Sequence, residues 1–154
     1  MITEFVQVRG FSGDERSGAT GPRPANGRPG GQPGARVLVV DDDPSILDTV
    51  SSILSSEGFQ VMSAAGGQQA MALLRSWHPT LILLDMRMPI MDGWAVAKAM
   101  REEGATVPIV VMTAAESAAR WADEIGAAGH LAKPFGLDEL LACVAKHAGG
   151  DRRN

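Results

Sequence analysis

The chain contains no tyrosine and only one cysteine, Cys143, among its 154 residues. A single cysteine excludes an internal disulfide and agrees with a reducing compartment, although a small core side chain would look the same. No apolar run approaches the roughly 20 residues that span a bilayer. Glu4 and Arg9 interrupt the amino-terminal segment, where a secretory signal needs a continuous apolar stretch. We therefore expect a cytoplasmic protein that does not bind membranes.

An excess of positive charge is also absent, because the formal net charge is -4. Proteins that bind nucleic acid normally carry a basic surface, so we do not expect a nucleic-acid partner. Residues 1–35 contain eight glycines and four prolines and lack a sustained apolar period. They are predicted to form a disordered arm, followed by one folded domain over residues 36–148 and a short polar tail over residues 149–154. That tail is too short for an effector domain, so we expect the folded domain to act alone.

Strand and helix patterns alternate five times after the arm. They predict an α/β fold with a doubly wound, five-stranded parallel sheet, flavodoxin-like strand order 2-1-3-4-5 and helices on both faces. The short apolar runs predict strands near residues 36–41, 59–63, 80–85, 107–112 and 128–132. The helical periods predict helices near residues 44–57, 67–77, 93–103, 117–125 and 137–148.

Acidic side chains follow two strands of this sheet. Asp41 and Asp42 come after the first apolar run, and Asp85 ends the third. Because the carboxyl ends of parallel strands meet at one edge of a sheet, we expect these carboxylates to lie close together. Such crowding is unfavourable unless a cation compensates for it. Carboxylate oxygens are ligands that suit Mg²⁺, so the sequence predicts a magnesium site.

A hydroxyl and an amine are predicted at the same edge, because Thr113 and Lys133 follow the fourth and fifth strands. Pro134 favours an extended conformation of Lys133. A carboxylate beside a divalent cation can attack a phosphoryl group, while a lysine and a threonine hydroxyl can bind its oxygens. Each residue alone is more often a cap, a turn residue or a surface charge, so the prediction depends on their joint occurrence.

Over about residues 36–148 the chain resembles a two-component response regulator receiver domain. The resemblance rests on four segments in the order and spacing of that family: Val-Leu-Val-Val-Asp-Asp-Asp, Leu-Ile-Leu-Leu-Asp-Met-Arg-Met-Pro-Ile-Met-Asp-Gly, Val-Val-Met-Thr-Ala and Lys-Pro-Phe. It implies that Asp85 is the phosphoacceptor and that Thr113 and Lys133 contact the phosphoryl group. It also implies a Mg²⁺ site whose ligands are Asp42, Asp85, the backbone carbonyl of Arg87 and, through water, Asp41.

Three features depart from the family pattern. His130 stands where the family usually has a tyrosine or phenylalanine whose ring movement is coupled to the threonine, here Thr113. It could serve as the switch or be a partly buried histidine without a signalling role. Arg87 and Ala115 occupy positions that often control access of water to the phosphoryl group, so the phosphoryl lifetime is not predictable. The stretch from Thr113 to Gly126 is about two residues shorter than in well-known members, so the fourth helix is expected to be short or shifted.

The resemblance implies a sensor histidine kinase or a phosphotransfer protein as the phosphodonor. We expect the output to be a downstream protein target that binds the surface of the fourth helix, fifth strand and fifth helix, transfer of the phosphoryl group onward in a phosphorelay, or a phosphorylation-dependent homodimer. Trp121, in the fourth predicted helix, is a candidate contact for a partner, although a tryptophan at a helix-packing position is somewhat more common.

Two other functions stay open. The segment Val39-Val40-Asp41-Asp42-Asp43 also fits a phosphatase resembling the haloacid dehalogenase group, in which Asp41 would be the nucleophile. Pro44 and the lack of a clear acidic pair after Lys133 argue against that assignment. The second alternative is a receiver-like binding module that works without phosphorylation. The receiver resemblance implies a signalling protein, not an enzyme, which assists only its own phosphorylation and dephosphorylation.

Overall fold

A computed structural model of the protein describes residues 34–148. The predicted tail and the predicted arm, apart from Gly34 and Ala35, lie outside the described residues. Ala35 is buried in the core, so the folded part includes at least one residue before the predicted boundary at residue 36. Within the described part of the chain, no helix is both long and apolar enough to pass through a bilayer.

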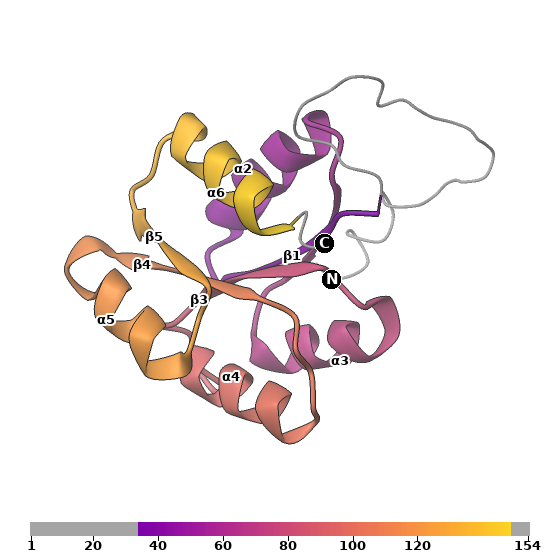
Figure 1. The fold of residues 1–154 in the computed structure, drawn as a ribbon, viewed down its shortest axis with the longest axis vertical. Helices are drawn as coiled ribbons and strands as arrows, with labels where there is room; N and C mark the ends of the chain where they lie inside the picture. The colour runs from indigo at the N-terminus through magenta and orange to yellow at the C-terminus, as the bar shows by residue number, and fades with distance from the viewer. Residues whose placement is uncertain (1–33, 149–154) are drawn as a thin grey trace.

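Five parallel strands form one sheet in the order β2-β1-β3-β4-β5, as predicted from the sequence (Figure 1). The strands are β1 (Arg36–Val40), β2 (Gln60–Ala64), β3 (Leu81–Asp85), β4 (Ile109–Ala114) and β5 (Gly129–Lys133). The helices are α2 (Pro44–Ser56), α3 (Gly67–Trp77), α4 (Gly93–Glu102), α5 (Ala115–Ile125) and α6 (Leu137–Ala148). The number, type and order of the elements in residues 34–148 confirm the predicted fold class.

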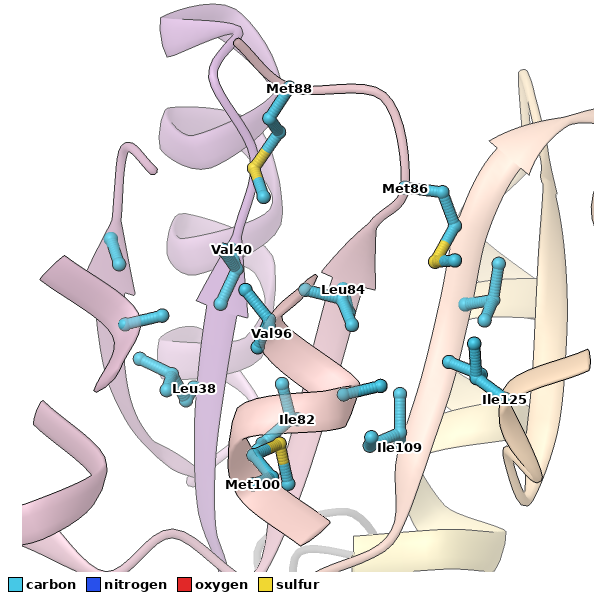
Figure 2. Close-up of a cluster of buried hydrophobic side chains, with 14 of the residues drawn as sticks. Leu38, Val40, Ile82, Leu84, Met86, Met88, Val96, Met100, Ile109 and Ile125 are labelled. Carbon is cyan, nitrogen blue, oxygen red and sulfur yellow. The ribbon is translucent and has the colours of Figure 1, made fainter. Parts of the chain in front are cut away.

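Helices cover both faces of the sheet (Figure 1). Helices α2 and α6 pack on one face, where Val50, Leu54 and Val144 meet the strands. Helices α3, α4 and α5 pack on the other face, and Figure 2 shows Val96 and Met100 of α4 beside side chains of the central strands. Both faces of β3 are thereby covered, and all of its residues are buried. This double burial explains why β3 is a continuous apolar run and not an alternating one.

The largest differences from the predicted boundaries concern β4 and α5. Strand β4 begins at Ile109, two residues after the predicted start at residue 107. Strand β4 continues through Thr113 to Ala114, and α5 begins at Ala115, two residues before the predicted start at residue 117. The chain passes from strand to helix without an intervening loop, and no side chain caps the helix. The shortness of this stretch is therefore accommodated by an early helix start, and α5 keeps 11 residues.

Two aspartates fix the loops beside the carboxyl edge of the sheet. The side chain of Asp43 accepts a hydrogen bond from the Ser45 amide, and Pro44 follows it at the first turn of α2. The side chain of Asp92 accepts one from the Ala95 amide at the start of α4. Such caps satisfy helix amides that have no intrahelical partner. They therefore fix where both helices begin, next to the ends of β1 and β3.

Both ends of the described chain lie at the opposite edge of the sheet. Ala35, which precedes β1, and Ala148, which ends α6, belong to the same buried cluster. Near the end of α6, the His147 ring lies against Gly129, the first residue of β5. The amino ends of the strands and the carboxyl end of α6 are therefore neighbours.

Gly93 packs against the backbone that follows β3. An added Cβ would lie 2.7 Å from the Met86 Cα and 3.0 Å from the Asp85 carbonyl oxygen, and the Gly93 amide donates to the Met86 carbonyl at 3.0 Å. We expect Gly93→Ala to lower the free energy of unfolding by about 1 to 3 kcal/mol, because backbone atoms must move to accept the methyl group. Urea denaturation measures this change.

Gly136→Ala is the matched control for this prediction. An added Cβ at Gly136 would meet only the end of the Glu139 side chain, at 3.8 Å. We expect Gly136→Ala to lower the free energy of unfolding by less than about 1 kcal/mol, the usual scale of a substitution at a helix cap. Equal losses in Gly93→Ala and Gly136→Ala would show that the close contact with Met86 does not limit residue 93.

Candidate functional site

Residues from four strands meet at the carboxyl edge of the sheet. Asp41 follows β1 directly, and Asp85 is the last residue of β3, which pairs with β1. Strand β4 lies on the other side of β3 and carries Thr113, and Lys133 ends the neighbouring β5. The parallel order thus brings together two acids, a hydroxyl and an amine that lie far apart in the sequence.

Three carboxylates form the acidic part of the site. Asp41, Asp42 and Asp85 each place an oxygen within 4.8 Å of the other two. Asp41 is fully buried and Asp85 is 5% exposed, whereas Asp42 faces solvent. Carboxylates that share a small, partly buried space repel one another. The predicted clustering of the acids is therefore present in the structure.

Lys133 lies between the two buried acids. Its Nζ donates a hydrogen bond to Asp41 Oδ2 at 2.7 Å and lies 3.5 Å from Asp85 Oδ1. Burial alone would lower the pKa of Lys133, but the hydrogen bond to Asp41 and the charges of both acids outweigh it and raise the pKa. The lysine is therefore a fixed positive charge at this site. Its peptide bond to Pro134 is cis.

Asp41 and Asp85 differ in how their oxygens are satisfied. Asp41 accepts from Lys133 through Oδ2 and from the Asp43 amide through Oδ1, at 2.9 Å. Burial and the charge of Asp41 raise the pKa of Asp85 from 3.8 to about 6, against the opposing effects of Lys133 and the Arg87 amide. The negative charge of Asp85 is thus incompletely compensated, and positive charge brought to it is stabilising.

Thr113 and His130 lie on the same face of the sheet. Val111 and Thr113 alternate with Met112 along β4, and Val111 belongs to the cluster beneath α4 and α5. In β5, His130 pairs with Val111 and Ala132 pairs with Thr113, so the histidine points to the α5 side. Thr113 is buried, but His130 is exposed, unlike the partly buried histidine of one sequence-based alternative.

Arg87 contributes in a way that the sequence does not predict. Its backbone amide lowers the pKa of the Asp85 carboxyl, and its exposed guanidinium lies over the ring of Trp121, with 5.6 Å between Cζ and the ring centroid. Trp121 packs edge-on against Trp94 of α4, with 4.8 Å between centroids. No sequence signal connects these residues, because the contacts arise from the way α4 and α5 cross.

The composition of the acidic cluster fits a divalent cation. Its donors are hard carboxylate oxygens, one of them on the exposed side chain of Asp42, and one buried acid has a raised pKa. Cations such as Mg²⁺ bind through one or two carboxylates and retain waters and phosphate oxygens as further ligands. The cluster could therefore hold a metal ion of this kind.

Known proteins share this sequence pattern. A profile of the response regulator receiver domain matches residues 37–145. Sporulation initiation phosphotransferase F of Bacillus subtilis is 35% identical over 114 residues, which cover 73% of this chain and 92% of that protein. Response regulator MprA of Mycolicibacterium vanbaalenii is 39% identical over 109 residues, but they cover 70% of this chain and 47% of that protein. The match thus spans about half the length of that relative.

Solved structures with the same fold include chemotaxis protein CheY4 of Vibrio cholerae, with 34% identity and a TM-score of 0.67. That match covers 73% of this chain and 98% of the other. The receiver domain of NtrX from Brucella abortus has 28% identity and a TM-score of 0.69, with coverage of 75% and 99%. Together with the match over residues 37–145, these similarities show that the chain belongs to the response regulator receiver domain family.

Proposed function

We propose that Asp85 is the phosphoacceptor of this receiver domain and takes a phosphoryl group from a sensor histidine kinase or a phosphotransfer protein. The observation that carries the proposal is the position of Lys133, whose amine lies 3.5 Å from Asp85 and is hydrogen-bonded to Asp41. A fixed cation beside an under-compensated carboxylate is suited to receive added negative charge.

Phosphoryl transfer requires Asp85 in its ionised form. A carboxylate oxygen attacks the phosphorus, a new O–P bond forms, and the P–N bond to the donor histidine breaks with its electron pair going to the imidazole nitrogen. We propose that Asp42, Asp85, the backbone carbonyl of Arg87 and, through water, Asp41 hold a Mg²⁺ ion. When bound, the ion supplies positive charge for the carboxylates and for the phosphoryl oxygens.

Lys133 and Thr113 have separate roles in this proposal. Lys133 neutralises one phosphoryl oxygen, since its amine already lies at Asp85. Thr113 lies on the adjacent strand β4, and its hydroxyl donates a hydrogen bond to another phosphoryl oxygen. Because the threonine is buried on the α5 side of the sheet, such a contact would couple the phosphoryl group to α5.

The environment of Asp41 disfavours the phosphatase alternative. Both oxygens of Asp41 accept hydrogen bonds, one from Lys133 and one from the Asp43 amide, and the residue is fully buried. Hydrogen bonds to both oxygens reduce the nucleophilicity of a carboxylate, and full burial makes Asp41 less accessible to a substrate than Asp85, which is 5% exposed. The binding-module alternative leaves the raised pKa of Asp85 and the lysine contact without a role.

The output is proposed to be a change in the surface formed by α5, β5 and α6, which binds a downstream protein or a second copy of the chain. The exposed side chain of His130 lies on this surface, on β5. We propose that the side chains of His130 and Thr113 change conformation between the unphosphorylated and the phosphorylated protein. In this role the protein promotes only its own phosphorylation and dephosphorylation.

Intact-mass spectrometry after incubation with acetyl phosphate tests the proposal. We expect a mass gain of one phosphoryl group that requires Mg²⁺ and is lost in Asp85→Asn. Asp41→Asn serves as the discriminating variant, because it removes the nucleophile of the phosphatase alternative. Acetyl phosphate turnover that stops only in Asp41→Asn would transfer the assignment to the phosphatase, and no mass gain in the unmodified protein would favour a binding module.

A further inference from the structure

A chain of aromatic contacts connects the Asp85 region with helix α5. The Arg87 guanidinium lies over Trp121 of α5, and Trp121 packs against Trp94 of α4 with an interplanar angle of 67°. Nε1 of Trp94 donates a hydrogen bond to Glu124 of α5 at 3.0 Å. Both tryptophans are half-buried. Arg87 is thus the link between this tryptophan pair and the loop that follows Asp85.

The Arg87 side chain has the freedom and the length to change partners. Arg87 stands two residues after Asp85, and its side chain is exposed. Within residues 34–148, the ion pairs of the structure do not include Arg87. Because Arg87 is only two residues from Asp85, a guanidinium on three methylene groups is long enough to reach a phosphoryl oxygen attached there.

A phosphoryl group on Asp85 would compete with Trp121 for the guanidinium. It brings up to two negative charges and three strong acceptor oxygens. A planar guanidinium binds such oxygens through paired N–H donors, and these charge-assisted bonds are stronger than a cation–π contact at an exposed site. The unphosphorylated carboxylate already has the Lys133 amine 3.5 Å away, which agrees with the guanidinium lying over the ring.

We propose that Arg87 binds the phosphoryl group on Asp85 and leaves Trp121 when it does so, thereby altering the tryptophan pair between α4 and α5. This inference rests on the proposed phosphorylation of Asp85. The movement of Arg87 away from Trp121 would provide an aromatic switch in this chain. The position that usually holds the family's aromatic switch residue is occupied here by His130, an exposed residue on β5. The surface that a partner reads would then include Trp121 and Trp94.

The tryptophans of the chain provide both the signal and its control. Besides Trp94 and Trp121 there is Trp77, at the end of α3, where Arg36 lies over its ring with 5.8 Å to the centroid. Arg36 begins β1, so this similar pair lies at the opposite edge of the sheet from Asp85. A Trp77→Phe protein therefore reports only on the pair beside Arg87.

The experiment records tryptophan emission and intact mass on the same samples, before and after acetyl phosphate and Mg²⁺. We expect the emission of Trp77→Phe to change in intensity and to shift to longer wavelength in step with the phosphoryl mass gain. Adding Arg87→Ala to Trp77→Phe should produce the altered spectrum before phosphorylation, and the spectrum should not change further. A Trp94→Phe, Trp121→Phe protein, which keeps Trp77, should show no phosphorylation-dependent change.

The outcomes separate this inference from the proposed function. A phosphoryl mass gain without an emission change in Trp77→Phe would overturn the role of Arg87 and leave Asp85 as phosphoacceptor. The same emission change with and without the Arg87 side chain would also overturn it. Absence of any mass gain would refute both proposals. Arg87 is exposed and Trp77→Phe preserves an aromatic side chain, so both variants should fold.

Discussion

Lys133→Met is expected to destabilise the protein strongly in magnesium-free buffer near pH 7.5. The substitution removes the 2.7 Å hydrogen bond to Asp41 and leaves this fully buried carboxylate without its cation, next to Asp85. Breaking a buried ion pair costs roughly 3 to 5 kcal/mol, and because the lysine side chain is 25% exposed we expect about 2 to 3 kcal/mol. Urea denaturation measures the loss, and added Mg²⁺ should recover part of it.

Lys98→Met is the matched control for this substitution. Lys98 forms an ion pair with Glu102 on the surface of α4, and both side chains are mostly exposed. Exposed pairs contribute about 0 to 1 kcal/mol, so this variant should unfold almost as the unmodified protein does. If Lys133→Met were no less stable than Lys98→Met, the amine of Lys133 would not compensate the buried acids.

Asp85→Asn is expected to have the opposite effect on stability. The pKa of Asp85 is raised from 3.8 to about 6 by burial and by the charge of Asp41. Between these two values the folded protein binds more protons than the unfolded chain, so the free energy of unfolding falls as the pH rises from about 4 to about 6 and then levels off. For a pKa shift of this size, the free energy of unfolding falls by up to about 3 kcal/mol over this pH range.

The asparagine side chain cannot ionise, so Asp85→Asn should lack this loss of stability. We expect the variant to be about 1 to 2 kcal/mol more stable than the unmodified protein near pH 8 without Mg²⁺, since some of the gain is offset by a weaker contact with Lys133. Near pH 4 the two proteins should be similar. Urea unfolding at several pH values, with and without Mg²⁺, measures the difference.

Asp123→Asn provides the control for the pH series, because Asp123 is exposed on α5 and remote from the acidic cluster. It should follow the unmodified protein at every pH. Added Mg²⁺ should stabilise both of these proteins above pH 6 and have little effect on Asp85→Asn. A difference between Asp85→Asn and the unmodified protein that is constant from pH 4 to pH 8 would contradict a raised pKa at Asp85.

The sequence predicts most of the fold because its signals are local. Continuous apolar runs such as the one before Asp85 mark strands that are buried on both faces, and Asp43-Pro44 marks a helix start. Strand order then follows from the small number of arrangements open to alternating strands and helices. The meeting of Asp41, Asp85 and Lys133 could be predicted for the same reason, since parallel strands end at one edge.

Other features could not be predicted because they depend on contacts between elements. The start of α5 at Ala115 has no capping residue to indicate it. The contact of Arg87 with Trp121 depends on how α5 lies beside α4, and the exposure of His130 depends on what covers the last strand. A one-dimensional pattern contains the periodicity of each element but not the side chains that an adjacent element presents.

Both ends of the described chain lie away from the acidic cluster. This arrangement matters when the domain is attached to a surface or fused to other proteins. Ala35 precedes β1, and Ala148 follows His147, whose ring lies against Gly129 at the start of β5, so both lie at the amino edge of the sheet, whereas Asp41, Asp85 and Lys133 lie at the carboxyl edge. A five-residue strand such as β1 separates these edges by about 16 Å. Residues 34–148 could therefore be anchored to a sensor chip, or inserted between two fluorescent proteins, with the acidic edge still facing the solution.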